Sequence, residues 1–372
     1  GPIVRAKEFI PQLHRPYELS QAEFGMGIFW ILNGLIKKIW LADYLAVNLV
    51  DRVFAMPGSF SGFENLLALY AYSLQVYADF SGYTDMAIGI ALLMGFRLPL
   101  NFNSPYKARN VGEFWKRWHI SLSSWLKDYL YIPMGGNRGG SMFTLISGCI
   151  LGGFVMLMLP NTGSRLILAG SLLILGAIGY GIPGIRRRLS TNVNLMMTML
   201  LGGLWHGASW NFVLWGGLNG LGLVVYKGWR RISPWETGRQ WRKRAIGIFL
   251  TFHFITFTRI WFRSGSHVSW EGLDQPHNIW EEWFTANEMI NRLTSSFWSS
   301  PILEIATGYA PVLSLMAAGF AIHLIPERFK RNYRKAFAHA PFLVQLAATL
   351  AVIALAYAGL ASGVQPFIYF QF

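Results

Sequence analysis

The sequence predicts an all-α fold, a multi-pass transmembrane helical bundle with re-entrant and interfacial helices, and three observations support this. First, 53% of the residues are hydrophobic and only 13% are charged, whereas soluble domains carry about 25% charged residues. Second, apolar runs recur along the whole chain, several of them near the roughly 20 residues that a bilayer crossing needs. Third, basic residues cluster between these runs, which is typical of cytoplasmic loops.

The apolar runs define the expected helices. They lie at about 24–36, 65–96, 142–159, 166–182, 194–226, 245–262, 306–325 and 341–360. The run at 65–96 is too long for one straight span and is interrupted by YADFSGYTD, so we expect two helices or one broken helix there. Asp79 and Asp85 lie in this interruption. Carboxylates at membrane depth mark functional sites or buried ion pairs. The sequence alone does not decide between these two roles for Asp79 and Asp85.

Residues 113–132 predict an amphipathic helix at the membrane interface. One face carries apolar residues at spacings of three and four: Phe114, Trp118, Leu122, Trp125 and Tyr129. Basic residues lie away from this face, as they do in interfacial helices. The helix also carries His119. The glycine loop GGNRGG at 135–140 follows with Arg138, and it is either a plain turn or a phosphate cradle built from backbone N–H groups.

The run at 194–226 contains His206, inside GGLWHG at 202–207, and no formally charged residue. An ionisable side chain at membrane depth usually faces a polar cavity or takes part in chemistry. Histidine is also the side chain best suited to proton transfer near neutral pH. The alternative is a structural histidine that donates to a carbonyl across a helix break at the glycines.

The loops orient the helices. Basic clusters place 227–244 and 326–340 in the cytoplasm, and the acidic loop 263–305 outside. The spans 245–262 and 306–325 then cross once each, and the C-terminus lies outside. Basic residues near 186–188 and near 227–230 place both ends of 194–226 inside. His206 would therefore sit at the apex of a re-entrant hairpin, which is tolerated only where protein or a cavity surrounds it.

Several chemistries are excluded or lack support. The single cysteine, Cys149, rules out an intrachain disulfide and a cysteine-rich metal site. Without a cysteine cluster or HExxH, we expect no metal. GxSxG and Walker A sequences are absent too. The net charge of +14 is concentrated in loops, so it indicates membrane orientation and not nucleic-acid binding. Two histidines without a metal suit general base chemistry on a hydroxyl.

Three long segments, in this order, resemble one family: QVYADFSGYTDMAIGIALLMGF, LNFNSPYKARNVGEFWKRWHISLSSWLKDYLYIPMGGNRGG and LLGGLWHGASWNFVLWGGLNG. They are similar to the membrane-bound O-acyltransferases, and the GGNR after the interfacial helix resembles the bacterial alginate O-acetyltransferase branch. The closing PFIYFQF resembles the same branch. The similarity covers most of residues 1–262.

The resemblance implies a single membrane domain over 1–372, arranged around a funnel in the bacterial inner membrane. His206 matches the family's catalytic histidine and His119 its second functional histidine. No bound cofactor is implied: acyl-CoA, and in particular acetyl-CoA, would be the cytoplasmic donor substrate. The acyl group would pass to an exported polysaccharide such as alginate, with help from periplasmic acyl-transfer proteins. Two departures are expected: further helices before Gly1, and an inserted helical hairpin at 141–190.

These inferences predict a membrane O-acyltransferase with His206 and His119 as catalytic residues. Asp79, Asp85, Arg138 and Asn211 are expected to bind substrate or support the site, and Asn211 and Arg138 are candidate oxyanion donors. The alternative is a proton-coupled transporter or channel with an intramembrane His/Asp path. A scaffold for polysaccharide export without catalysis is a third possibility, which the two intact histidine motifs disfavour.

Overall fold

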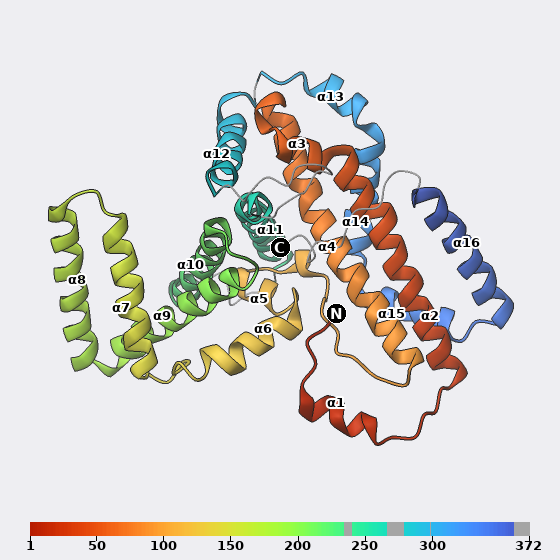
Figure 1. Cartoon of the computed structure of the whole chain (residues 1–372), viewed down its shortest axis with the longest axis horizontal. Coiled ribbons are helices and arrows are strands. Elements are labelled where there is room, and N and C mark those ends of the chain that lie inside the picture. The colour runs from red at the N-terminus through yellow and green to blue at the C-terminus, as the bar shows by residue number, and fades with distance from the viewer. Residues whose placement is uncertain (234–239, 266–278, 298, 361–372) are drawn as a thin grey trace. The chain divides into compact units, whose positions relative to one another are not determined.

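The computed structural model describes residues 1–233, 240–265, 279–297 and 299–360, and every regular element in them is helical. The all-α prediction is therefore confirmed for these residues. The chain divides into two compact units (Figure 1). The first unit comprises residues 1–121 and 245–372, and the second comprises 122–244.

The first unit contains the N-terminal and C-terminal helices. Its elements are α1 (Ala6–Leu13), α2 (Gln21–Ile36), η1 (Lys37–Asp43), η2 (Ala46–Val50), α3 (Asp51–Ala55), η3 (Pro57–Ser59), α4 (Gly62–Leu93), η4 (Pro105–Lys107), α5 (Val111–Trp115), α11 (Trp241–Ser264), α12 (Ile279–Ser295), α13 (Ile302–Gly308), α14 (Ala310–Leu324), α15 (Glu327–Ala338) and α16 (Phe342–Leu360). η1 and η2 are π-helical turns that continue α2 without a break.

Helix α4 is one continuous helix of 32 residues, so the predicted interruption of the 65–96 run is wrong. The polar residues of YADFSGYTD do not break the backbone because they meet partners on the neighbouring helix. The glycines of α4 do not mark a helix break either, because they allow α2 to pack closely against this helix. A Cβ on Gly34 of α2 would lie 2.5 Å from the Gly82 carbonyl, and a Cβ on Gly89 would lie 2.5 Å from the Gly27 carbonyl. Such close approach of helices is typical of membrane proteins.

Three helical segments are long and apolar enough to cross a membrane, among the described residues. They are Gln21–Ala55, Trp241–Ser264 and Phe342–Gly359. A fourth candidate is the pair α13 and α14, which bends by 81°. The expected spans at 245–262, 306–325 and 341–360 coincide with α11, α14 and α16, whereas the first span extends well beyond the predicted 24–36. The multi-pass topology stays a prediction.

Residues 326–340, expected as a loop, fold into helix α15. Its aromatic side chains anchor it to α2: the rings of Tyr333 and Phe337 lie 5.6 and 5.7 Å from the ring of Phe29. The Arg334 guanidinium stands 5.0 Å from the ring of Trp30. The sequence of α15 is strongly basic on one side and aromatic on the other, which suits a helix at the membrane interface.

The second unit is built on helical hairpins. Helix α6 (Ile120–Leu126) leads into it, followed by η5 (Lys127–Tyr131), α7 (Met142–Met158), α8 (Thr162–Gly181), α9 (Pro183–Leu204) and α10 (Trp210–Ile232). Helices α7 and α8 form a hairpin (Figure 1) whose apolar side chains are largely exposed, for example Leu145 at 67% and Leu173 at 75%. Helices α9 and α10 pack so closely that a Cβ on Gly216 would lie 2.4 Å from the Met199 carbonyl.

Candidate functional site

His119 lies at a break between two short helices. The predicted continuous helix over 113–132 is wrong: α5 ends at Trp115, and α6 begins at Ile120. The backbone of His119 has a φ of 44°, a left-handed conformation that costs free energy for a residue with a side chain. Such strain persists only where the surroundings impose it, and it is concentrated at functional sites.

Asn101 imposes this break. Its carbonyl accepts the N–H of Ile120 at 2.9 Å, and its Oδ1 accepts the N–H and hydroxyl of Ser121 at 3.1 and 2.8 Å. The same Oδ1 lies 3.2 Å from Nδ1 of His119. Asn101 therefore caps the start of α6 and holds the imidazole with one buried amide oxygen. Sequence reasoning missed this residue because it lies 18 positions from its partner.

The His119 ring is buried, with 3% of its surface exposed, and packs edge-on against Phe80 at 4.6 Å between ring centroids. The preceding Trp118 stacks under the guanidinium of Arg259, which stands 4.7 Å from its ring. Arg259 comes from α11 and donates to the Ser73 carbonyl at 2.9 Å. An arginine inside an apolar run was the signal that could have revealed it, since intramembrane charges are rare and usually functional.

His206 lies in the turn between α9 and α10, so the predicted helix break at GGLWHG is confirmed. Its imidazole is buried and surrounded by aromatic rings: the centroids of Trp205, Trp215 and Phe212 lie 5.0, 5.2 and 6.1 Å away. Its backbone N–H donates to the Gly203 carbonyl at 2.9 Å. The two helices place His206 at the apex of a hairpin. Its re-entry into the membrane stays a prediction.

Asn211 lies in the first turn of α10, five residues after His206. Its side chain is 1% exposed, and no hydrogen bond to its amide oxygen or nitrogen is found among the described residues. A buried amide without a partner costs free energy, so such a group calls for an explanation, and a catalytic role is one that would supply it. The N-terminus of α10, capped by Ser209, also presents backbone N–H groups at this turn.

The GGNRGG loop is held to α9 by its carbonyl groups. Arg187 donates to the carbonyl of Asn137 at 2.8 Å, and Arg186 donates to the carbonyl of Gly139 at 3.1 Å. Asn194 donates to the carbonyl of Gly136 at 3.2 Å. These contacts favour the interpretation as an anchoring turn over that as a phosphate cradle. Arg138 itself is exposed.

Asp79 and Asp85 are in buried ion pairs with lysines of η1. Asp85 accepts from Lys37 at 2.6 Å and from the Asn33 amide at 2.6 Å. Lys38 lies 2.7 Å from Asp79 and 2.7 Å from Asp43. The pairing explains how these carboxylates are tolerated at depth and weakens the case for a proton path. Their role as support of the active site stays a prediction.

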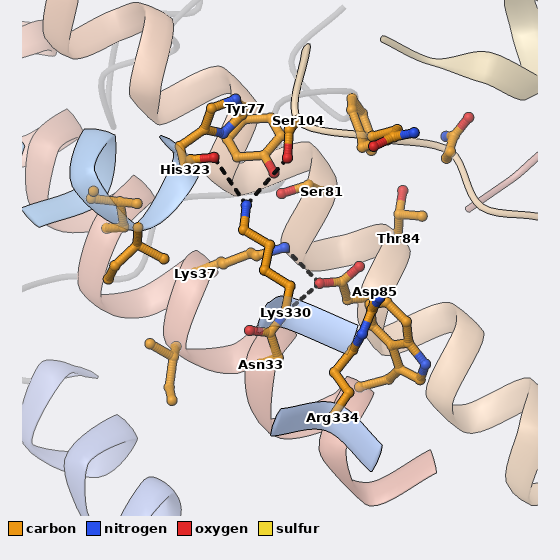
Figure 2. A pocket seen from close by; sticks show the side chains of 18 of the residues that line it. Asn33, Lys37, Tyr77, Ser81, Thr84, Asp85, Ser104, His323, Lys330 and Arg334 are labelled. Carbon is orange, nitrogen blue, oxygen red and sulfur yellow. Dashed lines mark hydrogen bonds and ion pairs between the residues drawn. The ribbon is translucent and has the colours of Figure 1, made fainter. Parts of the chain in front are cut away.

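A cavity of about 390 Å³ opens beside these groups in the first unit. Figure 2 shows its polar wall, where Lys37, Asp85, Ser104, His323 and Lys330 converge from η1, α4, α14, α15 and the segment before η4. Asn101, which holds His119, also lines the cavity. His323 is 3% exposed, and its Nε2 accepts the backbone N–H of Tyr106 at 3.2 Å. The sequence reasoning did not single out His323.

The expected site residues fall into two groups. His119, Asp79 and Asp85 belong to the first unit, and His206, Asn211 and Arg138 belong to the second. Within the first unit, Asn101 and the cavity connect the surroundings of His119 to those of Asp85. Within the second, His206 and Asn211 share one turn. The expected meeting of His119 and His206 stays a prediction.

Comparison with known proteins identifies the family. The model of the membrane-bound O-acyltransferase family matches residues 1–147 and 183–266. The chain belongs to the membrane-bound O-acyltransferase family. Both histidines lie in the matched ranges, so the resemblance carried by the three long segments is confirmed. The match leaves out 148–182, which covers most of the α7–α8 hairpin.

Named relatives of this family are similar over more than half of the chain. It is 39% identical over 243 residues to a "Probable alginate O-acetylase" of Azotobacter vinelandii, covering 65% of this chain and 38% of that protein. It is 34% identical over 267 residues to the peptidoglycan O-acetyltransferase of Helicobacter pylori, covering 71% and 41%. It is 27% identical over 292 residues to the teichoic acid D-alanyltransferase of Streptococcus thermophilus, covering 73% and 59%. The chain thus spans less than half the length of the first two relatives.

Proposed function

We propose that this chain carries the catalytic core of a membrane O-acyltransferase of the bacterial inner membrane. It transfers a short acyl group, acetyl, from acyl-CoA in the cytoplasm to hydroxyl groups of an exported polysaccharide such as alginate. Acyl transfer from a thioester needs a base for the acceptor hydroxyl and donors for the oxyanion. One observation carries the proposal: inside the family match, the buried His206 precedes α10 by four residues, and the first turn of α10 carries the buried amide of Asn211, for which no partner is found among the described residues.

The chemistry at this turn proceeds in two stages. His206 takes the proton of the acceptor hydroxyl as its oxygen attacks the thioester carbonyl carbon, and a tetrahedral oxyanion forms. The Asn211 amide and the backbone N–H groups at the start of α10 stabilise that negative charge. The carbon–sulfur bond then breaks, and the thiolate takes the proton back from the imidazolium. The acceptor leaves as an ester and the donor as a thiol.

His119 acts with His206 in this proposal, positioning the thioester or assisting proton transfer. Its strained backbone and its bond to Asn101 hold the imidazole in one orientation. The acyl group then reaches exported polymer through periplasmic acyl-transfer proteins. The names of the relatives support a polymeric acceptor, because alginate, peptidoglycan and teichoic acid are all polymers.

The decisive experiment measures loss of the acetyl label from acetyl-CoA by the full-length protein in proteoliposomes, with alginate oligosaccharide and periplasmic acyl-transfer proteins supplied as acceptors. His206→Ala is expected to lower turnover by roughly 10²–10⁴-fold. The exposed His14 provides a matched control, because His14→Ala removes an imidazole that lies outside the site. Near-normal transfer by His206→Ala would remove the catalytic assignment.

The double variant tests whether the two histidines act together. Residues that work as one catalytic unit are strongly non-additive. We therefore expect His119→Ala/His206→Ala to be no slower than His206→Ala alone. Multiplication of the two single effects would show that His119 acts in a separate step. A purified protein that neither hydrolyses nor transfers the thioester would favour the transporter alternative.

A further inference from the structure

The cavity of the first unit has an unusual surplus of positive charge at one end. The charged groups of the described residues around it are Lys37, Asp85, Lys107, Glu327, Lys330 and Arg334. Two of the cations are paired: Lys37 with Asp85 at 2.6 Å, and Arg334 with Glu327 at 2.6 Å. Lys107 donates to the Ile325 carbonyl at 2.5 Å. The two carboxylates are therefore already paired, and among the cations that line the cavity this leaves Lys330.

Lys330 is the centre of this surplus. Its Nζ donates to the Ser104 hydroxyl at 3.2 Å and to the His323 carbonyl at 3.0 Å, as Figure 2 shows. Among the residues that the structure describes, no carboxylate forms an ion pair with it. Burial and then repulsion from Lys107 lower the pKa of Lys330 to about 8. An anion beside this ammonium would relieve both effects.

Apolar side chains of two helices also line the cavity. They are Leu315, Ala318 and Ile322 of α14, and Trp30 and Ile36 of α2. Both helices belong to segments that can span a membrane. Helix α15, with its basic residues, closes the same region at the side assigned to the cytoplasm by its charge. Tryptophan and tyrosine at such a level are typical of the membrane interface.

We propose that this cavity binds an anionic phospholipid of the cytoplasmic leaflet, with its phosphate beside the Lys330 ammonium and an acyl chain along α14. Basic pockets between transmembrane helices on the cytoplasmic side are suited to lipid headgroups. A volume of about 390 Å³ is in the range of small-molecule sites. The site is separate from the acyl-transfer proposal and does not depend on it. The bound lipid would brace the wall that contains Asn101, and through it His119.

Lipid photo-crosslinking tests the site directly. The full-length protein is placed in phosphatidylcholine vesicles containing phosphatidylglycerol with a photoreactive group in its acyl chain, and crosslinked peptides are mapped. We expect crosslinks on α14 between Leu315 and Ile322. Loss of one cation at the headgroup, by Lys330→Gln, should reduce them about fivefold. The matched control is Arg331→Gln, because Arg331 is an exposed neighbour outside the cavity, and it should change nothing.

Cavity filling provides a second, independent variant. Ala318→Phe leaves every charge in place but occupies the apolar part, and it should lower the same crosslinks while the control peptides on α16 are unchanged. Raising the pH through about 8 should also lower them, because the Lys330 ammonium loses its charge. A bound anion raises the pKa of Lys330, so the midpoint lies at or above that value.

Three results would overturn the proposal. Crosslinks spread evenly over the exposed helices, with no dependence on Lys330, would show ordinary surrounding lipid. Displacement of the lipid by inorganic phosphate would show a site for a free anion. Displacement of the lipid by coenzyme A would show that the cavity is a site for a soluble nucleotide and not for a phospholipid. Displacement by unlabelled phosphatidylglycerol alone supports the lipid site.

Discussion

Asp85 illustrates how a single charged residue is tolerated in the apolar part of this protein. The carboxylate and its partner Lys37 are both mostly buried, with 9% and 24% of their side-chain surfaces exposed. The Asn33 amide satisfies the same carboxylate oxygen. A buried pair of this kind contributes little over an apolar pair of similar shape, but removal of one partner leaves an uncompensated charge.

The first prediction follows from this pair. Asp85→Leu should destabilise the protein by about 3–5 kcal/mol, because Lys37 then remains buried without its counter-charge. Lys37→Met/Asp85→Leu should recover most of that loss. Thermal unfolding of purified protein in detergent measures both. A single variant as stable as the wild type would contradict the structural interpretation.

The same variants decide between the two roles that the sequence left open for Asp85. If Asp85 only neutralises Lys37, the double variant retains acetyl transfer. If Asp85 supports the active site, the double variant is stable and inactive. Stability and turnover must therefore be measured on the same preparation.

The second prediction concerns Asn101 as a positioning residue. Asn101→Ala removes the cap of α6 and the partner of His119 at once, so it should cost about 1 kcal/mol of stability. It should lower kcat more than it raises KM, because the change affects the orientation of His119 and not the bulk of the donor site. Asn103→Ala is the matched control in the same segment. Equal kcat in the two variants would remove the positioning role.

At the scale of elements, close helix contacts decide where polar groups lie. Helix α4 stays unbroken over 32 residues because glycines let α2 approach and lysines of η1 meet its carboxylates. The helix expected over 113–132 breaks at His119 because Asn101 supplies bonds from elsewhere in the chain. In both cases a partner distant in sequence determined the outcome.

The third prediction concerns the α7–α8 hairpin. Residues 148–182 lie outside the family match, and the hairpin side chains are mostly exposed within their unit. Replacement of 148–182 by a short glycine–serine linker should preserve membrane insertion and the His206-dependent turnover. The start of α7 stays tied to α9, since Thr144 donates to Asn194 at 2.9 Å. Loss of folding on size-exclusion chromatography would show that the hairpin is part of the catalytic core.

At the scale of the whole molecule, the basic segments set the orientation in the membrane. Helix α15 is exposed along much of its length and strongly basic, and the segment around Arg242 is basic too. The acidic loop between them includes Asp274, which lies outside the described residues. The alternation of charge predicts opposite sides of the membrane for these segments.

The fourth prediction tests this topology. In a Cys149→Ala background, cysteines at Arg242 and Arg331 should be protected from an impermeant thiol reagent added outside intact cells. A cysteine at Asp274 should react. The native cysteine is exposed and the only one in the chain, so its removal gives a clean background. Labelling at 242 without labelling at 274 would invert the topology and place the proposed donor on the opposite side.

The sequence by itself determined the class of this protein, the position of most helices and the two histidines that carry the proposed chemistry. These features are local: hydrophobic runs report burial in lipid or core, basic clusters report orientation, and the family segments are contiguous in the chain. The helix break at GGLWHG could also be predicted from the sequence, because the glycines that cause it are neighbours of His206 in the chain.

Only the tertiary structure decided which polar groups meet. Asn101 reaches His119, Lys37 reaches Asp85, and Lys330 reaches Ser104 across 18, 48 and 226 positions. Burial makes such pairs energetically necessary, since an unpaired charge in an apolar medium is costly. The identity of the partner depends on how helices pack, which no local pattern contains. The cavity beside α15 arises in the same way, from five separate segments of the chain.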